Sequence, residues 1–295
     1  MEELVDVLVD TFLDTVKILP FLYITYVIME YIEHKMSTKN KKIIQKAGKF
    51  EPLIGGLLGM IPQCGFSAAA TNFYVGRIIS LGTLIAVYLS TSDEMLAILI
   101  SEQQNPLTII KIILLKAVIG IICGFIIDGI LRKIHKNKEP IKHEKTSDIC
   151  EHDNIDGAKS NVFVSSIKHT ANIVLYIFII SLLLNVLFAY VGEENLGQIV
   201  LNKPVISNML AGIIGLIPNC AASVAITELY VKGVIGFGTM MSGLLVGAGV
   251  GLLVLFKLNN RSKKENFKLV GVLYVIGVIS GILIDLVNIG GLLGI

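Results

Sequence analysis

The sequence predicts an all-α polytopic membrane protein made of two inverted-topology repeats, each with about five membrane segments and with paired broken or re-entrant helices. Three observations support this fold class. The chain has 295 residues, of which 54% are hydrophobic and 16% are charged. Its mean hydropathy is +0.75, which is typical of a chain with many membrane spans. Apolar segments recur along the chain, and one stretch of 25 residues has a related copy later in the sequence.

The apolar segments are each about 20 residues long, enough to cross a hydrocarbon core of about 30 Å. They run over 12–32, 53–75, 78–100, 107–131, 172–190, 205–229, 234–256 and 269–289. A charged stretch at 132–160 separates the two halves and has too few apolar residues to pack as a core. The expected organisation is a membrane repeat at 1–131, a charged cytoplasmic linker at 132–160 and a second membrane repeat at 161–295.

The duplicated stretch is the strongest functional signal. Residues 59–83 read GMIPQCGFSAAATNFYVGRIISLGT, residues 215–239 read GLIPNCAASVAITELYVKGVIGFGT, and 12 of the 25 aligned residues are identical. A proline inside an apolar segment breaks a helix, and a membrane tolerates this where the freed backbone is buried in protein or lines a cavity. Paired broken helices in corresponding halves indicate the substrate site of a transporter.

The distribution of lysines predicts the membrane topology. Residues 35–49 hold six lysines and no acid, and residues 132–145 and 257–268 are also basic, so we expect all three to be cytoplasmic. Residues 191–204 are weakly acidic and are expected outside. The first segments of the two halves then run in opposite directions, as in the inverted repeats of many secondary transporters.

This topology requires that segments 53–75 and 78–100 together cross the membrane an odd number of times. At least one of them must therefore be re-entrant or split. We expect breaks at Ile61–Gly65 (IPQCG), at Ser90–Glu94 (STSDE) and, in the second half, at Ile217–Ala221 (IPNCA).

Each IPxC break brings together groups that bind ions. The prolines free the carbonyls of Leu58 and Ile214, and an amide and a thiol follow each proline directly. Thiolates favour Zn²⁺, Cu(I) or As(III), whereas oxygen ligands favour Mn²⁺ or Mg²⁺. The alternative is a packing kink in which cysteine is a small hydrophobe. The predicted substrate-binding residues are Pro62, Gln63, Cys64, Ser67, Asn72, Pro218, Asn219, Cys220, Ser223 and Glu228, and the predicted ligands of a transported metal ion are Cys64, Cys220 and Glu228.

Glu228 lies in an apolar segment eight residues after Cys220, and Asn72 holds the matched position in the first half. An acid there is unfavourable by roughly 2.5–3.5 kcal/mol on insertion scales, so we expect a functional role. Glu228 is the predicted coupling acid and Asn72 its neutral counterpart. The alternative places Glu228 near the membrane interface, beside Tyr230 and Lys232.

Asp93 and Glu94 are further candidates for coupling. They have no acidic partners, because Gly249 and Val250 lie 156 positions later. These acids either coordinate a cation or cap an external bend.

Asp128 and Asp285 form a matched pair of acids at the ends of GFIID and GILID. They are candidates for a shared gate or for hydrogen bonds between helices. Interfacial acids that reach water are the alternative.

The linker contains His143, Cys150 and His152, which can bind a metal transiently. Their spacing fits no closed zinc site, so a solvated linker is the competing interpretation.

The IPQCG and IPNCA motifs, the GFIID and GILID helix ends and the ICEHD sequence of the linker together resemble the ten-TM heavy-metal exporters. These are bacterial membrane proteins that are also labelled arsenic-efflux-like permeases or manganese transporters. The resemblance covers most of the chain. It implies five plus five helices and export of a metal ion or metalloid.

We therefore expect a multi-pass secondary transporter of the bacterial cytoplasmic membrane that moves a metal ion or metalloid outward and is coupled to protons. A homodimer is compatible with this plan. The alternatives are a transporter of a small organic or anionic solute and a channel. The chain carries neither GxxxxGK[ST] nor HExxH nor GxSxG, so we expect no nucleotide site, no enzyme activity and no cofactor. The net charge of +2 gives no support for nucleic-acid binding.

Overall fold

The computed structural model describes residues 50–61, 64–135, 204–259 and 263–293, together with scattered residues of 8–27 and 167–186. These residues form helices and turns, with no strand among them. The helices of the first half are α3 (Glu51–Gly59), α4 (Cys64–Val75), α5 (Leu81–Ser90), α6 (Asp93–Ser101) and α7 (Pro106–His135). Those of the second half are α10 (Pro204–Gly215), α11 (Cys220–Val231), α12 (Phe237–Val246), α13 (Val250–Leu258), α14 (Lys263–Leu286) and α15 (Ile289–Leu293).

Four of the predicted apolar segments are each divided into two short helices. Segment 53–75 contains α3 and α4, and segment 78–100 contains α5 and α6. The three predicted breaks are confirmed, because helix ends at Gly59, Ser90 and Gly215 and resumes at Cys64, Asp93 and Cys220. The predicted segments 12–32 and 172–190 lie mostly outside the described residues.

The second half contains one further break, which the sequence pattern did not predict. It lies between α12 and α13, at Gly247–Gly249. This break has three residues, whereas the equivalent break of the first half has only Thr91 and Ser92. Gly249 has a φ of 52° and a ψ of −138°, a conformation that residues with a Cβ rarely adopt.

This extra residue changes the correspondence between the halves from 156 to 157 positions. Helices α4 and α5 match α11 and α12 at an offset of 156, but α6 and α7 match α13 and α14 at 157. The partners of Asp93 and Glu94 are therefore Val250 and Gly251, which corrects the pairing with Gly249 and Val250.

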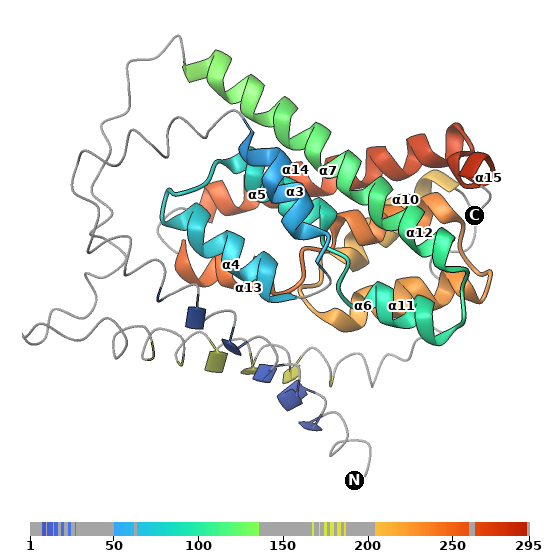
Figure 1. Cartoon of the computed structure of the whole chain (residues 1–295), viewed down its shortest axis with the longest axis horizontal. Helices are drawn as coiled ribbons and strands as arrows, with labels where there is room; N and C mark the ends of the chain where they lie inside the picture. Colours follow the sequence, from blue (N-terminus) through green and yellow to red (C-terminus); the bar gives the residue numbers. More distant parts are fainter. Residues whose placement is uncertain are drawn as a thin grey trace, which may run out of the picture.

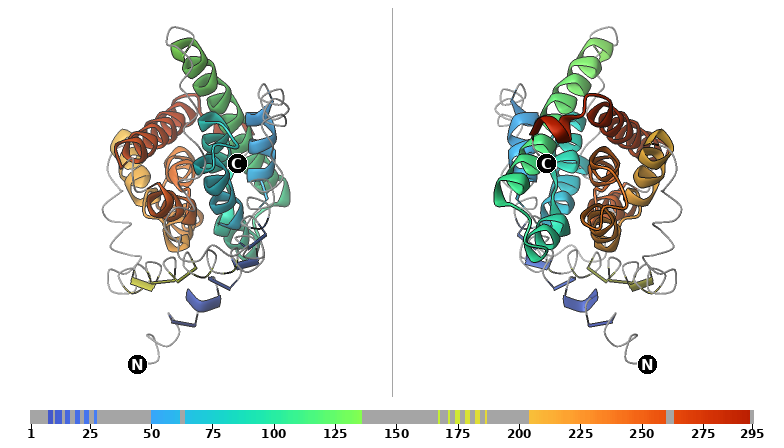
Figure 2. Two further views of the ribbon diagram at one scale, coloured as in Figure 1. Left: turned by 90° about the vertical axis from the view of Figure 1, so that its left-hand side faces the viewer. Right: turned by 90° about the vertical axis from the view of Figure 1, so that its right-hand side faces the viewer.

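The packing repeats along with the helices. Helix α5 packs against α3 and α7, and its counterpart α12 packs against α10 and α14. Across the halves, α4 packs on α13 and α11 packs on α6, which is the reciprocal exchange that an approximate two-fold relation produces (Figure 1). Figure 2 shows the helices of the first half beside those of the second. The inverted orientation of the halves in the membrane stays a prediction.

The short helices α5 and α12 form the centre of the molecule. Every residue from Gly82 to Ser90 and from Gly238 to Val246 is buried. The long helices α7 and α14 approach them closely at matched glycines, since a Cβ on Gly124 would lie 2.6 Å from the Gly82 carbonyl oxygen. Their opposite faces expose apolar side chains at helical spacing, as lipid-facing helices do. Those of α7 are Leu107, Ile110, Leu114, Val118, Ile122 and Phe125.

Three helical segments within the described residues are long and apolar enough to span a membrane. They are Pro106–Lys133, Phe237–Leu258 and Lys263–Leu286. The second of these contains the break between α12 and α13 and is 83% buried inside the protein, whereas each of the other two is 33% buried.

Candidate functional site

The amino-terminal ends of the two central helices are each capped by a carboxylate. The Gly82 amide donates to Asp128 Oδ1 over 2.9 Å, and the Gly238 amide donates to Asp285 Oδ1 over the same distance. The first amides of a helix have no partner within the helix and carry partial positive charge, so an anionic acceptor is favourable there. The matched acids thus make hydrogen bonds between helices, which was one of the two roles predicted for them.

A second group completes each cap. The Ser80 hydroxyl donates to Asp128 Oδ2 over 2.6 Å, and the Asn208 amide group donates to Asp285 Oδ2 over 2.8 Å. Asn208 also accepts from the Ser242 hydroxyl within α12. Two different sets of side chains therefore produce the same attachment of α5 to α7 and of α12 to α14.

The carboxyl-terminal ends of α5 and α12 converge on Lys116 of α7. This side chain is 1% exposed, and its ammonium donates to the carbonyl oxygen of Thr91 and, over 2.9 Å, to that of Leu244. Thr91 is the residue that ends α5, and Leu244 lies in the last turn of α12. One lysine thus joins the two breaks across the boundary between the halves.

The partners of Lys116 suit a cation. The last four carbonyls of a helix lack partners within the helix, and the helix dipole gives this end partial negative charge. A buried charge is unfavourable unless it is paired or fully hydrogen-bonded. Within the described part of the chain, the buried charged residues are Lys116 and Asp128 of α7. Asp128 contacts the amino-terminal end of α5, and Lys116 contacts its carboxyl-terminal end.

A second contact between the halves lies at Thr71 of α4. Its hydroxyl oxygen is 2.6 Å from the Tyr88 hydroxyl, 2.7 Å from the Ser67 carbonyl oxygen and 3.1 Å from the Gly251 carbonyl oxygen. A threonine hydroxyl has one proton to donate, so it donates to one of the two carbonyls and accepts from Tyr88. This network joins α4, α5 and α13.

The equivalent positions of the second half are less polar. Leu244 stands where the first half has Tyr88, and Leu273 stands where it has Lys116. Thr227 matches Thr71, and its hydroxyl donates to the Ser223 carbonyl of its own helix over 2.7 Å. In the contacts that cross between the halves, the first half supplies the side chains of Lys116 and Thr71, and the second half supplies the carbonyls of Leu244 and Gly251.

The predicted IPxC residues lie at the breaks before α4 and α11. Cys64 and Cys220 are the first residues of these helices, and Asn219 and Ser67 are buried. Pro62 and Gln63 lie outside the described residues, as do the side chains of both cysteines. Helices α4 and α11 pack on α13 and α6, respectively (Figure 1). The proximity of the two thiols stays a prediction.

Glu228 and Asn72 occupy matched positions but different environments. Asn72 is 1% exposed. The Glu228 side chain is 27% exposed, and its Oε2 accepts from the Lys232 ammonium over 2.8 Å. This contact joins residues one turn apart at the end of α11, and the role of Glu228 as a coupling acid stays a prediction.

The remaining candidates belong to the start of α6 and to the linker. Asp93 and Glu94 open α6, directly after the break at Thr91 and Ser92. His143, Cys150 and His152 fall outside the described residues. In the part of the chain that is described, no three His, Cys, Asp or Glu side chains gather as a metal-binding group.

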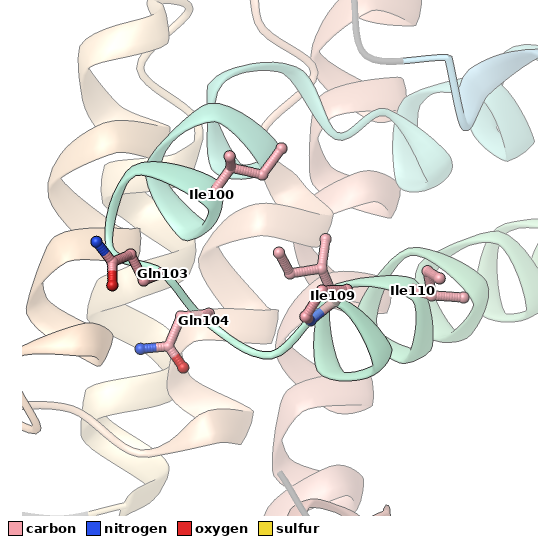
Figure 3. A pocket seen from close by; sticks show the side chains of 6 residues that line it. Ile100, Gln103, Gln104, Ile109 and Ile110 are labelled. Carbon is pink, nitrogen blue, oxygen red and sulfur yellow. The ribbon is translucent and has the colours of Figure 1, made fainter.

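An open pocket lies away from these breaks, at the turn between α6 and α7. Its volume is about 520 Å³, and it is lined by Ile100, Gln103, Gln104, Pro106, Ile109 and Ile110. Figure 3 shows Gln103 and Gln104 on the turn, with Ile109 and Ile110 at the start of α7. The lining carries no charged group, so it provides no ion ligand comparable to the helix ends at Lys116.

Lys116 is the central residue that sequence reasoning missed. The signal was available, because Lys116 lies within an apolar segment and has no acid three or four positions away. A lone basic residue at such a position is a functional candidate by the same argument that selected Glu228.

Comparison with known proteins identifies one family. Residues 1–193 and 172–294 match the sequence model of a family described as "Putative, 10TM heavy-metal exporter". No curated protein and no solved structure matches the chain.

Proposed function

Because the chain belongs to this ten-transmembrane heavy-metal exporter family, we propose that it is a secondary-active transporter that moves a metal ion or metalloid out of the cell in exchange for protons. Its binding site lies at the breaks after α5 and α12. The single observation that carries this proposal is the convergence of two buried helix ends on one buried ammonium. The carbonyls of Thr91 and Leu244 thus already bind a positive charge in the apolar interior of the protein.

The broken helices support transport rather than simple membrane anchoring. A break exposes backbone carbonyls at mid-helix, where they can replace part of the hydration shell of an ion. Described groups near the two breaks offer oxygen ligands, namely backbone carbonyls and the hydroxyls of Thr71 and Tyr88. Oxygen ligands favour Mn²⁺ or Mg²⁺, whereas the thiols of Cys64 and Cys220 at the other pair of breaks favour softer ions.

A transporter of an anionic solute is the second candidate, and one observation favours it. Lys116 is a buried cation, which can pair with a carboxylate or an oxyanion. Against this, its ammonium is held by carbonyl oxygens, which would repel an anion in the same place.

Transport by purified protein in liposomes tests the proposal. Vesicles with the protein should accumulate or release at least one species from a panel of Mn²⁺, Zn²⁺, Fe²⁺, Co²⁺ and arsenite, and an imposed pH gradient should drive this movement. Protein-free vesicles are the control. Cells that lack the protein should contain more of the same species than cells that express it.

The two candidates predict different outcomes in this assay. Movement of a cation that small carboxylates do not inhibit supports metal transport. Movement of a carboxylate or phosphate, with every metal on the panel left untouched, would replace it with the anion transporter.

A further inference from the structure

The carbonyls of Thr91 and Leu244 form a cation site whose resident occupant is the Lys116 ammonium. We propose that a transported cation takes the place of this ammonium, and that Lys116 loses its proton when the cation binds. This inference rests on the proposed function and names the group that couples cation and proton at that site. The coupling group is then a lysine that competes with the cargo.

The geometry supports competition for the same oxygens. Lys116 spans the boundary between the halves, because Thr91 belongs to the first half and Leu244 to the second. A cation bound by both carbonyls would therefore contact both halves, as the ammonium does. An ammonium and a metal ion cannot share these oxygens, because two positive charges a few ångströms apart repel strongly in an apolar interior.

The proton balance follows from the two forms of lysine. In its ammonium form Lys116 makes charge-assisted hydrogen bonds, which are roughly twice as strong as neutral ones. When a cation enters from the cytoplasm, the ammonium passes its proton to water on that side, and the neutral amine gives up the carbonyls. After the cation leaves on the outer side, the amine takes a proton from water there and returns to them.

Few other titratable residues lie on the elements that pack around Lys116. Helix α12 has none. The others on α3, α5 and α6 are Glu51, Tyr88, Asp93 and Glu94, and α7 itself carries Lys111 and Cys123. Helix α7 also carries Asp128, which caps the opposite end of α5, and Arg132, Lys133 and His135 beyond it. Glu51 accepts from the Ser80 amide at the opposite end of α5, and the Tyr88 hydroxyl is held by Thr71. The acids at the start of α6 are therefore the groups that a test must separate from Lys116.

Proton release on binding of Mn²⁺ provides that test. Mn²⁺ is added to purified full-length protein in weakly buffered detergent solution, and a pH indicator reports the protons released. The wild-type protein should release about one proton more per bound Mn²⁺ than Lys116→Gln, because a ligand site that starts protonated must lose its proton. Its affinity for Mn²⁺ should rise with pH, and this dependence should be weaker in Lys116→Gln.

Three further variants make the result specific. Lys116→Arg keeps a permanent positive charge in the site, so its affinity for Mn²⁺ should be at least about tenfold weaker at every pH. Lys111→Gln removes a lysine from the same helix, five positions away, and should behave as the wild type. Lys116→Met repeats the neutral substitution without a polar group, in case the glutamine variant is not monodisperse.

Two results would overturn the inference. One is proton release in Lys116→Gln or Lys116→Met that equals the wild type but disappears in Asp93→Asn or Glu94→Gln. The other is wild-type affinity for Mn²⁺ in Lys116→Arg. Either result leaves metal transport intact, whereas wild-type protein that neither binds nor transports any metal of the panel refutes the proposed function itself.

Discussion

The two halves of the chain share a scaffold but differ in the polar groups placed on it. In both halves a ten-residue helix is buried at the centre, and an aspartate on a long helix caps its amino-terminal end. At the carboxyl-terminal end the halves diverge, because the second half has Leu244 at the position of Tyr88 and Leu273 at the position of Lys116. The common features are those that hold the helices together. The differing features include Lys116, whose ammonium reaches a carbonyl of the second half.

Removal of the shared caps should have the largest effect on stability. Asp128→Ala deletes a buried carboxylate that accepts from both Gly82 and Ser80, and we expect a loss of about 3 kcal/mol. Asp285→Ala should lose about 2 kcal/mol, since Asp285 is less buried. The apparent melting temperature in detergent measures the loss of stability in both variants. Glu102→Ala, which changes an exposed residue, is the control. If only one variant is destabilised, the caps are not equivalent.

The extra residue in the second break gives the next largest effect. Gly249→Ala places a Cβ on a residue with φ 52°, and we expect a loss of about 2 kcal/mol. Gly247→Ala is the matched control, because Gly247 has φ −67° and a Cβ there would meet its nearest neighbour at 3.4 Å. Equal melting temperatures for the two variants would show that this break tolerates a Cβ throughout.

Substitution of the matched threonines compares a hydrogen bond between the halves, made by Thr71, with a hydrogen bond inside one helix, made by Thr227. Thr71→Val should lose about 1 kcal/mol, because it removes the acceptor of Tyr88 and a donor that reaches α13. Thr227→Val should lose about half as much, since its hydroxyl bonds to its own helix. A larger loss in Thr227→Val would mean that the second half also contributes side-chain links.

Glu228→Gln should have the smallest effect. Its partially exposed ion pair with Lys232 contributes less than about 0.5 kcal/mol. Proton-driven metal transport should persist in this variant, because the proposed coupling group is Lys116. Loss of pH-driven transport in a well-folded Glu228→Gln protein would instead establish Glu228 as the coupling acid, in agreement with its position in the apolar segment.

Much of this arrangement is predictable from the sequence, and the exceptions have physical reasons. The breaks at IPQCG and IPNCA follow from proline, and the break after Ser90 follows from a run of polar residues in an apolar segment. The break at Gly247–Gly249 leaves hydropathy unchanged, because glycine and alanine are compatible with both helix and lipid. The sequence signals this break through the spacing of matched residues in the two halves, which is 156 positions before the break and 157 after it.

The sequence predicted that the site lies at broken helices, but it did not predict that Lys116 belongs to the site. Matched prolines, thiols and acids are visible in the sequence because they occur twice. Lys116 occurs once, and its partners are backbone carbonyls, which leave no trace in the identity of Thr91 or Leu244. Sequence comparison of the two halves therefore finds the residues that they share, whereas Lys116, which links them at the breaks, is a residue that they do not share.

The single lysine also distinguishes this chain from a dimer of two identical halves. Two identical copies of one half would carry a lysine at both positions or at neither, and two copies would bring two ammonium groups to the same pair of helix ends. In this chain, Leu273 holds the second position, so one cation is balanced against both ends. Divergence in sequence between the two halves is what allows the centre of this repeated scaffold to hold an odd number of charges.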